Sequence, residues 1–139
     1  MTSNGEAVVM PMIVQRVIGA LAADPALVPL VAGRVSQTTP DPLVLPCVRV
    51  TRVGGQLTAE CRVDTADVQV DVMASSTDEA AQIAAVVFAA VLRLPGVTLP
   101  DAVVSCVRQV GGTQFLDDVS RAEPIDRVVG TFAVSHRPA

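Results

Sequence analysis

Few residues in this sequence have the chemistry of a nucleophile or a metal ligand. His136 is the one histidine and lies three residues from the C-terminus, while Cys47, Cys61 and Cys106 are far apart in the chain. A Cys–His nucleophile pair is geometrically possible, but no local motif supports it. The cysteines form no C-x-x-C pair, so we expect buried free thiols in a reducing compartment rather than a zinc site or a disulfide scaffold.

Three aspartates could form a carboxylate cluster for a metal ion or for acid–base catalysis. Asp67 and Asp71 share one face of a regular strand, whereas Asp64 falls on the other. One solvated strand face explains them more simply. The pairs Gly54-Gly55 and Gly111-Gly112 end predicted strands, and neither begins a phosphate loop or a dinucleotide-binding motif. We therefore expect a protein that is not an enzyme, with no catalytic, cofactor or metal site.

Length and composition indicate a protein that associates with other subunits. The 139 residues fit a single domain, 1–139, in which residues 1–7 are polar and expected to be disordered. Half of the residues are apolar, only 17% are charged, and the mean hydropathy is +0.50. No run approaches ~18 apolar residues, so a membrane span does not explain this content. Surface buried against other subunits explains it better.

The charge and the aromatic content argue against direct nucleic-acid binding. The formal net charge is −4, and such binding depends on neutralising phosphates. The chain has no Trp and no Tyr, and its three aromatic residues are Phe88, Phe115 and Phe132. It therefore lacks the usual platforms for stacking bases. The first residues carry no basic group before the apolar stretch, which is not the pattern of a signal peptide.

The N-terminal third predicts two helices and an extended connection. Apolar residues follow helical spacing over Val8–Ala23, with Pro11 in the first turn. Asp24 then reads as the N-cap of a short second helix, Pro25–Ala32. Residues 36–46 contain three prolines and are expected to be extended, leading into a strand.

The remaining sequence predicts strands around one long helix. Ser76 and Glu79 form a capping box that begins a helix over Thr77–Leu94. Four strands are expected, at Cys47–Val53, about Cys61–Ala74, Val103–Val110 and Arg127–His136. The order of elements predicts an α+β fold: a four-stranded, mainly antiparallel sheet with two main helices packed on one face.

The long helix is apolar over most of its circumference. One stripe can lie on the sheet, and a second stripe beside it consists of Ala81, Ala85, Phe88 and Leu92. Such a helix needs cover on more than one side. The first helix could supply that cover, or a neighbouring subunit could; the sequence leaves both open.

The connection over 113–126 is longer than most strand links, which run about 4–6 residues. Near its start it contains Phe115 and Leu116, which are apolar, followed by Asp117 and Asp118. Apolar residues in a polar loop either anchor the loop to its own core or dock onto a partner. These four residues are our candidates for partner docking, the first two as anchors and the acids as partners for Arg or Lys opposite.

The order of these pieces resembles the tail-completion, or tail-terminator, proteins of long-tailed bacteriophages. The resemblance covers about residues 10 to 137, and its landmarks are Leu27–Val35, Leu45–Val50, the Asp-rich stretch Asp67–Val72, the capped helix and a final strand ending in Arg. The family tends to have an aromatic residue where this chain has Cys47, and another at the end of the second strand, where it reads Met73-Ala74.

The resemblance implies a structural subunit without a cofactor. It implies a homo-oligomeric, usually hexameric, ring that caps the tail tube, stops tube growth and joins the tail to the head connector. The partners would be the tail tube protein and the head–tail connector protein. The ring would lie in the tail or neck of a virion assembled in the bacterial cytoplasm. The alternatives are a head-completion or neck connector ring, and a small α+β ligand-binding regulatory domain, which would need a pocket with convergent polar groups.

Overall fold

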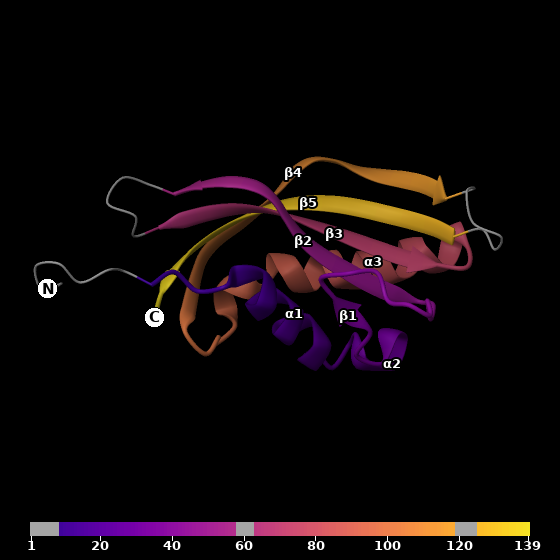
Figure 1. The fold of residues 1–139 in the computed structure, drawn as a ribbon, viewed down its shortest axis with the longest axis horizontal. Coiled ribbons are helices and arrows are strands. Elements are labelled where there is room, and N and C mark those ends of the chain that lie inside the picture. Colours follow the sequence, from indigo (N-terminus) through magenta and orange to yellow (C-terminus); the bar gives the residue numbers. More distant parts are fainter. Residues whose placement is uncertain (1–8, 58–62, 119–124) are drawn as a thin grey trace, which may run out of the picture.

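The computed structural model describes residues 9–57, 63–118 and 125–139. One sheet is covered on one side by helices (Figure 1), which confirms the α+β class. The helices are α1 (Ile13–Ala23), α2 (Val28–Val31), α3 (Thr77–Leu92) and the short 3-10 helix η2 (Leu94–Gly96). The strands are β1 (Val35–Ser36), β2 (Cys47–Leu57), β3 (Asp64–Ala74), β4 (Ala102–Asp118) and β5 (Ile125–Pro138).

The sheet has five strands rather than the four that we expected. Their order is β1-β2-β3-β5-β4, and every pairing is antiparallel except that of β1 with β2. The additional strand, β1, consists of two residues opposite Val48 and Arg49. Two residues are too few to show a strand period, which is why the sequence pattern did not reveal this strand.

The first helix begins at Ile13, five residues later than the expected Val8. Pro11 lies before the helix and not in its first turn, and Met12 is the N-cap. A residue that precedes proline is pushed toward extended backbone, so the helix does not extend back through Met10. The second helix also begins late, at Val28, because Asp24 caps the turn before it, accepting a 2.9 Å hydrogen bond from the Ala26 amide.

Two strands continue through the glycine pairs at which we expected them to end. β2 passes Gly54-Gly55 to reach Leu57, and β4 passes Gly111-Gly112 to reach Asp118. The register shifts at both places, between Arg52 and Gly54 and between Val110 and Gln114. The glycines therefore mark bulges. Gly55 has φ +121°, and a Cβ there would lie 2.2 Å from the Thr65 carbonyl oxygen.

The expected long connection over 113–126 is consequently wrong. Residues 113–118 belong to β4, and 125–126 belong to β5. The part between them lies outside the described residues. So does Cys61, at which we expected the second strand to start, and so do residues 1–7, which we expected to be disordered.

The core lies between the sheet and the two main helices. Alternate residues of β3 and β5 face it, including the fully buried Val68, Val70 and Phe132. The Ser76 cap at the start of α3 is confirmed, since the Glu79 amide donates a 3.2 Å hydrogen bond to the Ser76 hydroxyl. The Glu79 carboxylate accepts from the Ser75 amide at 3.4 Å and not from the Ser76 amide that a capping box would use. The helix ends at Leu92 instead of Leu94, which is buried in η2.

The proline-bearing connection covers part of the other face of the sheet, here called the outer face. Leu43 and Leu45 pack there on a second small core formed by Cys47, Met73 and Ile125. The Arg49 Nη1 donates a 3.0 Å hydrogen bond to the Thr39 hydroxyl, which fastens the same connection to β2. One end of the outer face is therefore also covered by protein.

Candidate interaction surfaces

An apolar groove lies between α3 and the distal half of β4. It encloses about 240 Å³, and its lining is Ala81, Ala84, Ala85, Phe88, Thr113, Phe115 and Val128. This lining contains no charged residue, and Thr113 is its one polar member. We call this feature the α3–β4 groove.

A glycine on β5 fixes the floor of the α3–β4 groove. A Cβ at Gly130 would lie 2.8 Å from the Phe88 Cζ, so only glycine leaves room for that ring. The Phe88 ring packs edge-on against the buried Phe132, with centroids 5.2 Å apart. Gly130 and Phe132 therefore hold one side of the Phe88 ring in place, and Phe88 also lines the groove.

The second apolar stripe of α3 is left partly uncovered in this chain. α1 contacts β1, β2 and part of α3, whereas Ala81, Ala85 and Phe88 of the stripe line the groove toward β4, at the other end of the strand order. Ala85 and Leu92 are exposed, Leu92 to 45%. The first of our two alternatives, cover from the first helix, is therefore wrong for these residues.

The four candidate docking residues lie on a strand, and this separates them. Neighbouring residues of a strand point to opposite faces. Phe115 is opposite the buried Val128 and lines the α3–β4 groove, with 61% of its surface exposed. Leu116 is opposite Arg127 on the outer face and is 38% exposed. The two side chains therefore lie on different faces of the sheet, and their predicted role in docking stays a prediction.

Asp117 and Asp118 occupy the last two positions of β4. They are paired in register with Asp126 and Ile125. Their predicted role as partners for basic residues on another protein stays a prediction.

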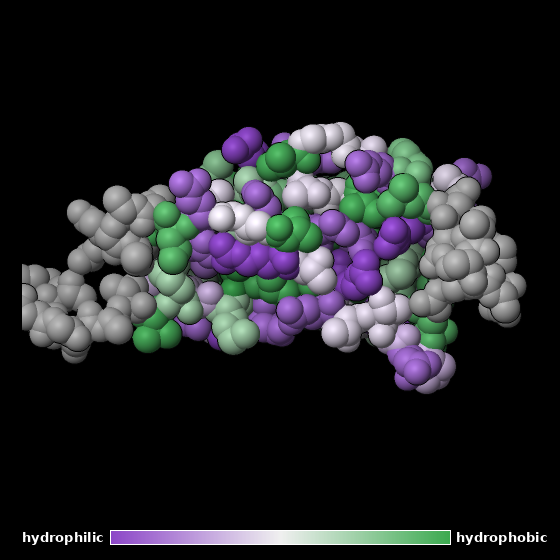
Figure 2. All heavy atoms as spheres, turned by 45° about the horizontal axis from the view of Figure 1, so that its top comes forward, coloured by the Kyte–Doolittle hydropathy of each residue, from purple (hydrophilic) through white to green (hydrophobic). Residues whose placement is uncertain are grey.

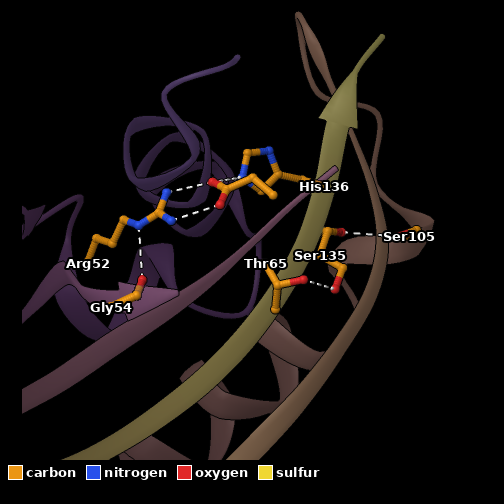
Figure 3. Close-up of polar contacts among 7 residues, drawn as sticks. Arg52, Gly54, Thr65, Ser105, Ser135 and His136 are labelled. Atoms are coloured by element: carbon orange, nitrogen blue, oxygen red, sulfur yellow. Dashed lines mark hydrogen bonds and ion pairs between the residues drawn. The ribbon is translucent and has the colours of Figure 1, made fainter. Parts of the chain in front are cut away.

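A buried polar cluster lies at the other end of the sheet, on the core face (Figure 3). His136 is fully buried, and its Nε2 lies 2.8 Å from the Asp64 Oδ2. The Arg52 guanidinium pairs with both carboxylate oxygens, with 2.8 Å from Nη2 to Oδ1. Arg52 Nε also donates to the Gly54 carbonyl. The cluster thus ties β2, β3 and β5 together.

Sequence reasoning missed this cluster. We expected a solvated strand face to explain the aspartates, but Asp64 is 3% exposed and Asp71 is fully buried. Asp64 does lie on the face opposite to Asp67 and Asp71, as expected. The signal in the sequence was the alternation of apolar residues along each strand. Asp64 precedes the apolar series of β3, His136 follows that of β5, and the two residues are opposite one another in register.

The charges in this cluster offset the cost of burying them. Burial alone raises the pKa of Asp64, but hydrogen bonds from Arg52 and His136, with the charge of Arg52, outweigh burial and lower the pKa below its usual value. Asp64 therefore stays ionised at neutral pH and accepts hydrogen bonds from both neighbours. This arrangement is a structural ion pair network, and within the described part of the chain the hydrogen-bond partner of His136 is the Asp64 carboxylate and not a thiol or a hydroxyl.

Asp71 forms a second ion cluster, on the outer face. Arg49 Nε donates to its Oδ2 at 3.0 Å, and Gln69 Nε2 donates to its Oδ1 at 2.9 Å. Arg127 Nη1 lies 3.9 Å away. Figure 2 shows polar residues interspersed with smaller apolar areas over this side of the molecule. Across residues 9–57, 63–118 and 125–139, no group of three or more His, Cys, Asp or Glu side chains could hold a metal ion.

A larger pocket of about 470 Å³ lies between α1 and the turn over 97–100. Its charged lining residues already have partners within the protein. Arg16 Nε donates to the Asp101 Oδ1 at 2.6 Å, and Arg93 pairs with Asp24 at 3.3 Å. Both charged lining residues, Arg16 and Asp24, are therefore engaged in ion pairs within the protein.

The cysteines differ in their surroundings. Cys47 is buried, as expected for a free thiol, and burial raises its pKa despite the nearby charges of Arg34 and Arg49. Cys106 is exposed, so the expectation of a buried thiol is wrong there. The candidate site described above is the open apolar surface of the α3–β4 groove.

Comparison with protein families places this surface in context. The family model described as "Tail completion protein gp17" matches residues 15–126, well over half of the chain. The chain belongs to this tail-completion family. The resemblance that we inferred from the order of sequence elements is thereby confirmed, and the tail-completion protein is a structural component of a phage-type tail.

A solved structure shares the fold of this tail-completion protein. It is a chain from the virion of a native gene transfer agent particle, with a TM-score of 0.64 and 16% sequence identity. The match covers 88% of the tail-completion protein and 92% of the other chain. A comparison with curated proteins finds no match. Within the described residues of this tail-completion protein, no helix has the length and apolar content that a membrane span requires.

Proposed function

We propose that this tail-completion protein is a tail terminator. Its copies form a closed ring, of six subunits as the family resemblance implies, that caps the tail tube and stops its growth. The ring then joins the tail to the head–tail connector protein in the neck of the virion. Assembly takes place in the bacterial cytoplasm and involves no catalysis and no cofactor.

The observation that carries this proposal is the open α3–β4 groove. A chain with so much apolar content should cover the apolar surface of its largest helix, yet Ala85 of α3 and Phe115 of the neighbouring β4 remain exposed. Exposed apolar surface of this kind marks sites of protein association. The family match supports a place for these associations in a tail. A terminating ring makes two kinds of association, with its own copies and with the tube.

The test is the mass of the purified protein, measured by light scattering after size exclusion, alone and after mixing with tail tubes. We expect a closed ring in at least one condition. A phage that lacks the gene should produce tails of uncontrolled length that fail to join heads, and the wild-type gene should restore infectious titre. A strict monomer in both conditions, or tails of normal length without the protein, would overturn the proposal.

A second experiment separates the terminator from a head-completion or neck connector ring. A terminator binds the end of isolated tail tubes, whereas a head-completion ring binds the portal side of isolated heads. Electron micrographs of the protein mixed separately with tubes and with heads distinguish the two outcomes.

A further inference from the structure

A closed ring of identical subunits needs two different surfaces on every copy. In a head-to-tail contact, a surface of one copy, here called the donor, inserts into a different surface of the next copy, here called the acceptor. The α3–β4 groove is concave and apolar, as an acceptor should be. The donor must then be an apolar projection elsewhere on the same chain.

Among the described residues, the strongest candidate for the donor is the stretch before α1. The three most exposed large apolar residues that the structure describes are Val9 (82%), Met12 (69%) and Phe115 (61%). Phe115 lines the groove, while Val9 and Met12 lie in the extended stretch before α1. Figure 1 places this stretch at one end of the molecule and the end of β4 at the other. A single head-to-tail contact would cover all three side chains.

The charges at the two ends are complementary. The groove lining is uncharged, and so is the sequence from Ala7 to Gln15. Asp78 lies one helical turn from Ala81 of the groove and forms no ion pair in the described residues. At the opposite end, exposed Arg137 makes one recorded hydrogen bond, to the Pro138 carbonyl. Arg137, like Asp78, forms no ion pair with the described residues, so a cation at the donor end can meet an anion at the acceptor end.

Interface size also favours a second copy over a separate peptide. A specific interface buries about 800 Å² on each partner, more than a four-residue segment can supply. A whole subunit whose segment enters the groove also brings its body against β4.

We propose that the residue 9–12 segment of one copy occupies the α3–β4 groove of the next copy, with Arg137 facing Asp78. This inference rests on the proposed ring. It assigns donor and acceptor surfaces to that ring.

Two variants test the assignment. Met12→Glu blocks the donor, and Ala85→Glu blocks the acceptor while keeping a good helix former in α3. Each variant alone should elute as a 14.4 kDa monomer where the wild type forms its ring. An equimolar mixture retains one intact contact, the donor of the Ala85→Glu copy in the groove of the Met12→Glu copy. It should therefore form a 1:1 dimer and no ring.

Matched controls add the same charge elsewhere. Gln82→Glu changes an exposed residue of α3 that does not line the groove, and Val44→Glu changes an exposed valine on the outer-face connection. Both controls should form wild-type rings, and circular dichroism should show that all four variants are folded.

Rings formed by either blocked variant, or a mixture that stays monomeric, would overturn the donor and acceptor assignment while leaving the ring itself intact. A wild-type protein that is monomeric both alone and on tail tubes would overturn the proposed function together with this inference.

Discussion

Asp64 shows how a charged side chain is accommodated at the edge of this apolar core. An isolated buried carboxylate would lose several kcal/mol of hydration free energy, on the order given for ions in protein interiors. Here Arg52 and His136 replace the lost water with hydrogen bonds. Arg52 keeps 39% of its side chain exposed, so its charge remains partly hydrated. One end of the network, the Arg52 guanidinium, is therefore in contact with solvent.

The lowered pKa of Asp64 predicts a pH dependence of stability. Its folded pKa lies below the unfolded value of about 3.9, so the stabilisation is present above that value. It is lost as the pH falls through the folded pKa. Asp64→Asn should cost about 1.5–3 kcal/mol at neutral pH, the usual contribution of hydrogen bonds to a charged group. Urea denaturation at several pH values measures both effects.

The control is Asp67→Asn, on the opposite face of the same strand. The wild type and this control should lose stability below about pH 4, where protonation of Asp64 begins to matter. The Asp64→Asn curve should be flatter and approach theirs in acid. Parallel curves for all three proteins would show that Asp64 does not stabilise the fold through its charge.

Residue-level prediction succeeded where the cause is local. The Ser76 cap needs only residues within one helical turn, so the sequence shows it directly. The Asp64–His136 pair joins residues 72 apart, and it exists only once the register of β3 with β5 is set. Strand alternation assigns each residue to a face, but it does not assign a partner across strands.

At the scale of the element, the start of α3 offers a direct test. Ser76→Ala removes the acceptor for the Glu79 amide and should lower stability by about 1 kcal/mol. Thermal melting of the variant beside the wild type measures the change. Ser75→Ala is a suitable control, because that hydroxyl contacts Glu79 at a longer 3.4 Å. An unchanged melting temperature for Ser76→Ala would mean that the cap contributes nothing to the helix.

The strand position of Phe115 and Leu116 makes their roles separable. Phe115→Ala should weaken ring formation about tenfold to a hundredfold, since burial of such a side chain contributes about 1.5–3 kcal/mol and each 1.4 kcal/mol is tenfold. It should change monomer stability little, because the side chain is 61% exposed. Leu116→Ala, on the outer face, should leave ring formation nearly unchanged. Concentration-dependent light scattering measures both.

The acidic pair provides the comparison. Asp117→Asn with Asp118→Asn should alter assembly by less than Phe115→Ala, because exposed ion pairs contribute about 0–1 kcal/mol. An effect of Leu116→Ala equal to that of Phe115→Ala would contradict the assignment of the groove as the contact surface.

The two glycine pairs explain why strand ends were predicted less well than strand centres. Glycine is depleted in strands and common in turns, so Gly54-Gly55 and Gly111-Gly112 indicated chain reversals. In the structure the neighbouring strand pairs with residues on both sides of each pair. The pairing that keeps β2 and β4 extended comes from β3 and β5, and local sequence does not contain it.

At the scale of the whole molecule, the acidic balance should prevent binding to DNA. The net charge is −4, and the arginines at positions 49 and 52 are already paired with Asp71 and Asp64. Micromolar protein should therefore leave the mobility of duplex and single-stranded DNA unchanged in a gel at low salt, where electrostatic binding is strongest. A clear shift would show that the chain presents an unpaired basic surface.

The overall architecture was predictable because order along the chain limits topology. Helices on one face of a mainly antiparallel sheet followed from the capped helix between strand pairs. The family followed from that same order. The missing strand β1 and the extra length of β4 depend on contacts with β2 and β5, so they become visible only in three dimensions.

Before any ring exists, each newly made subunit carries β4 as an open sheet edge among identical copies. A straight edge of 17 residues would present a long row of unpaired backbone groups, the template on which amyloid-like polymers grow. The register shift between Val110 and Gln114, with Gly111 at φ +70°, divides that row into two shorter stretches of different twist. The interruption disfavours endless strand-to-strand stacking of free subunits.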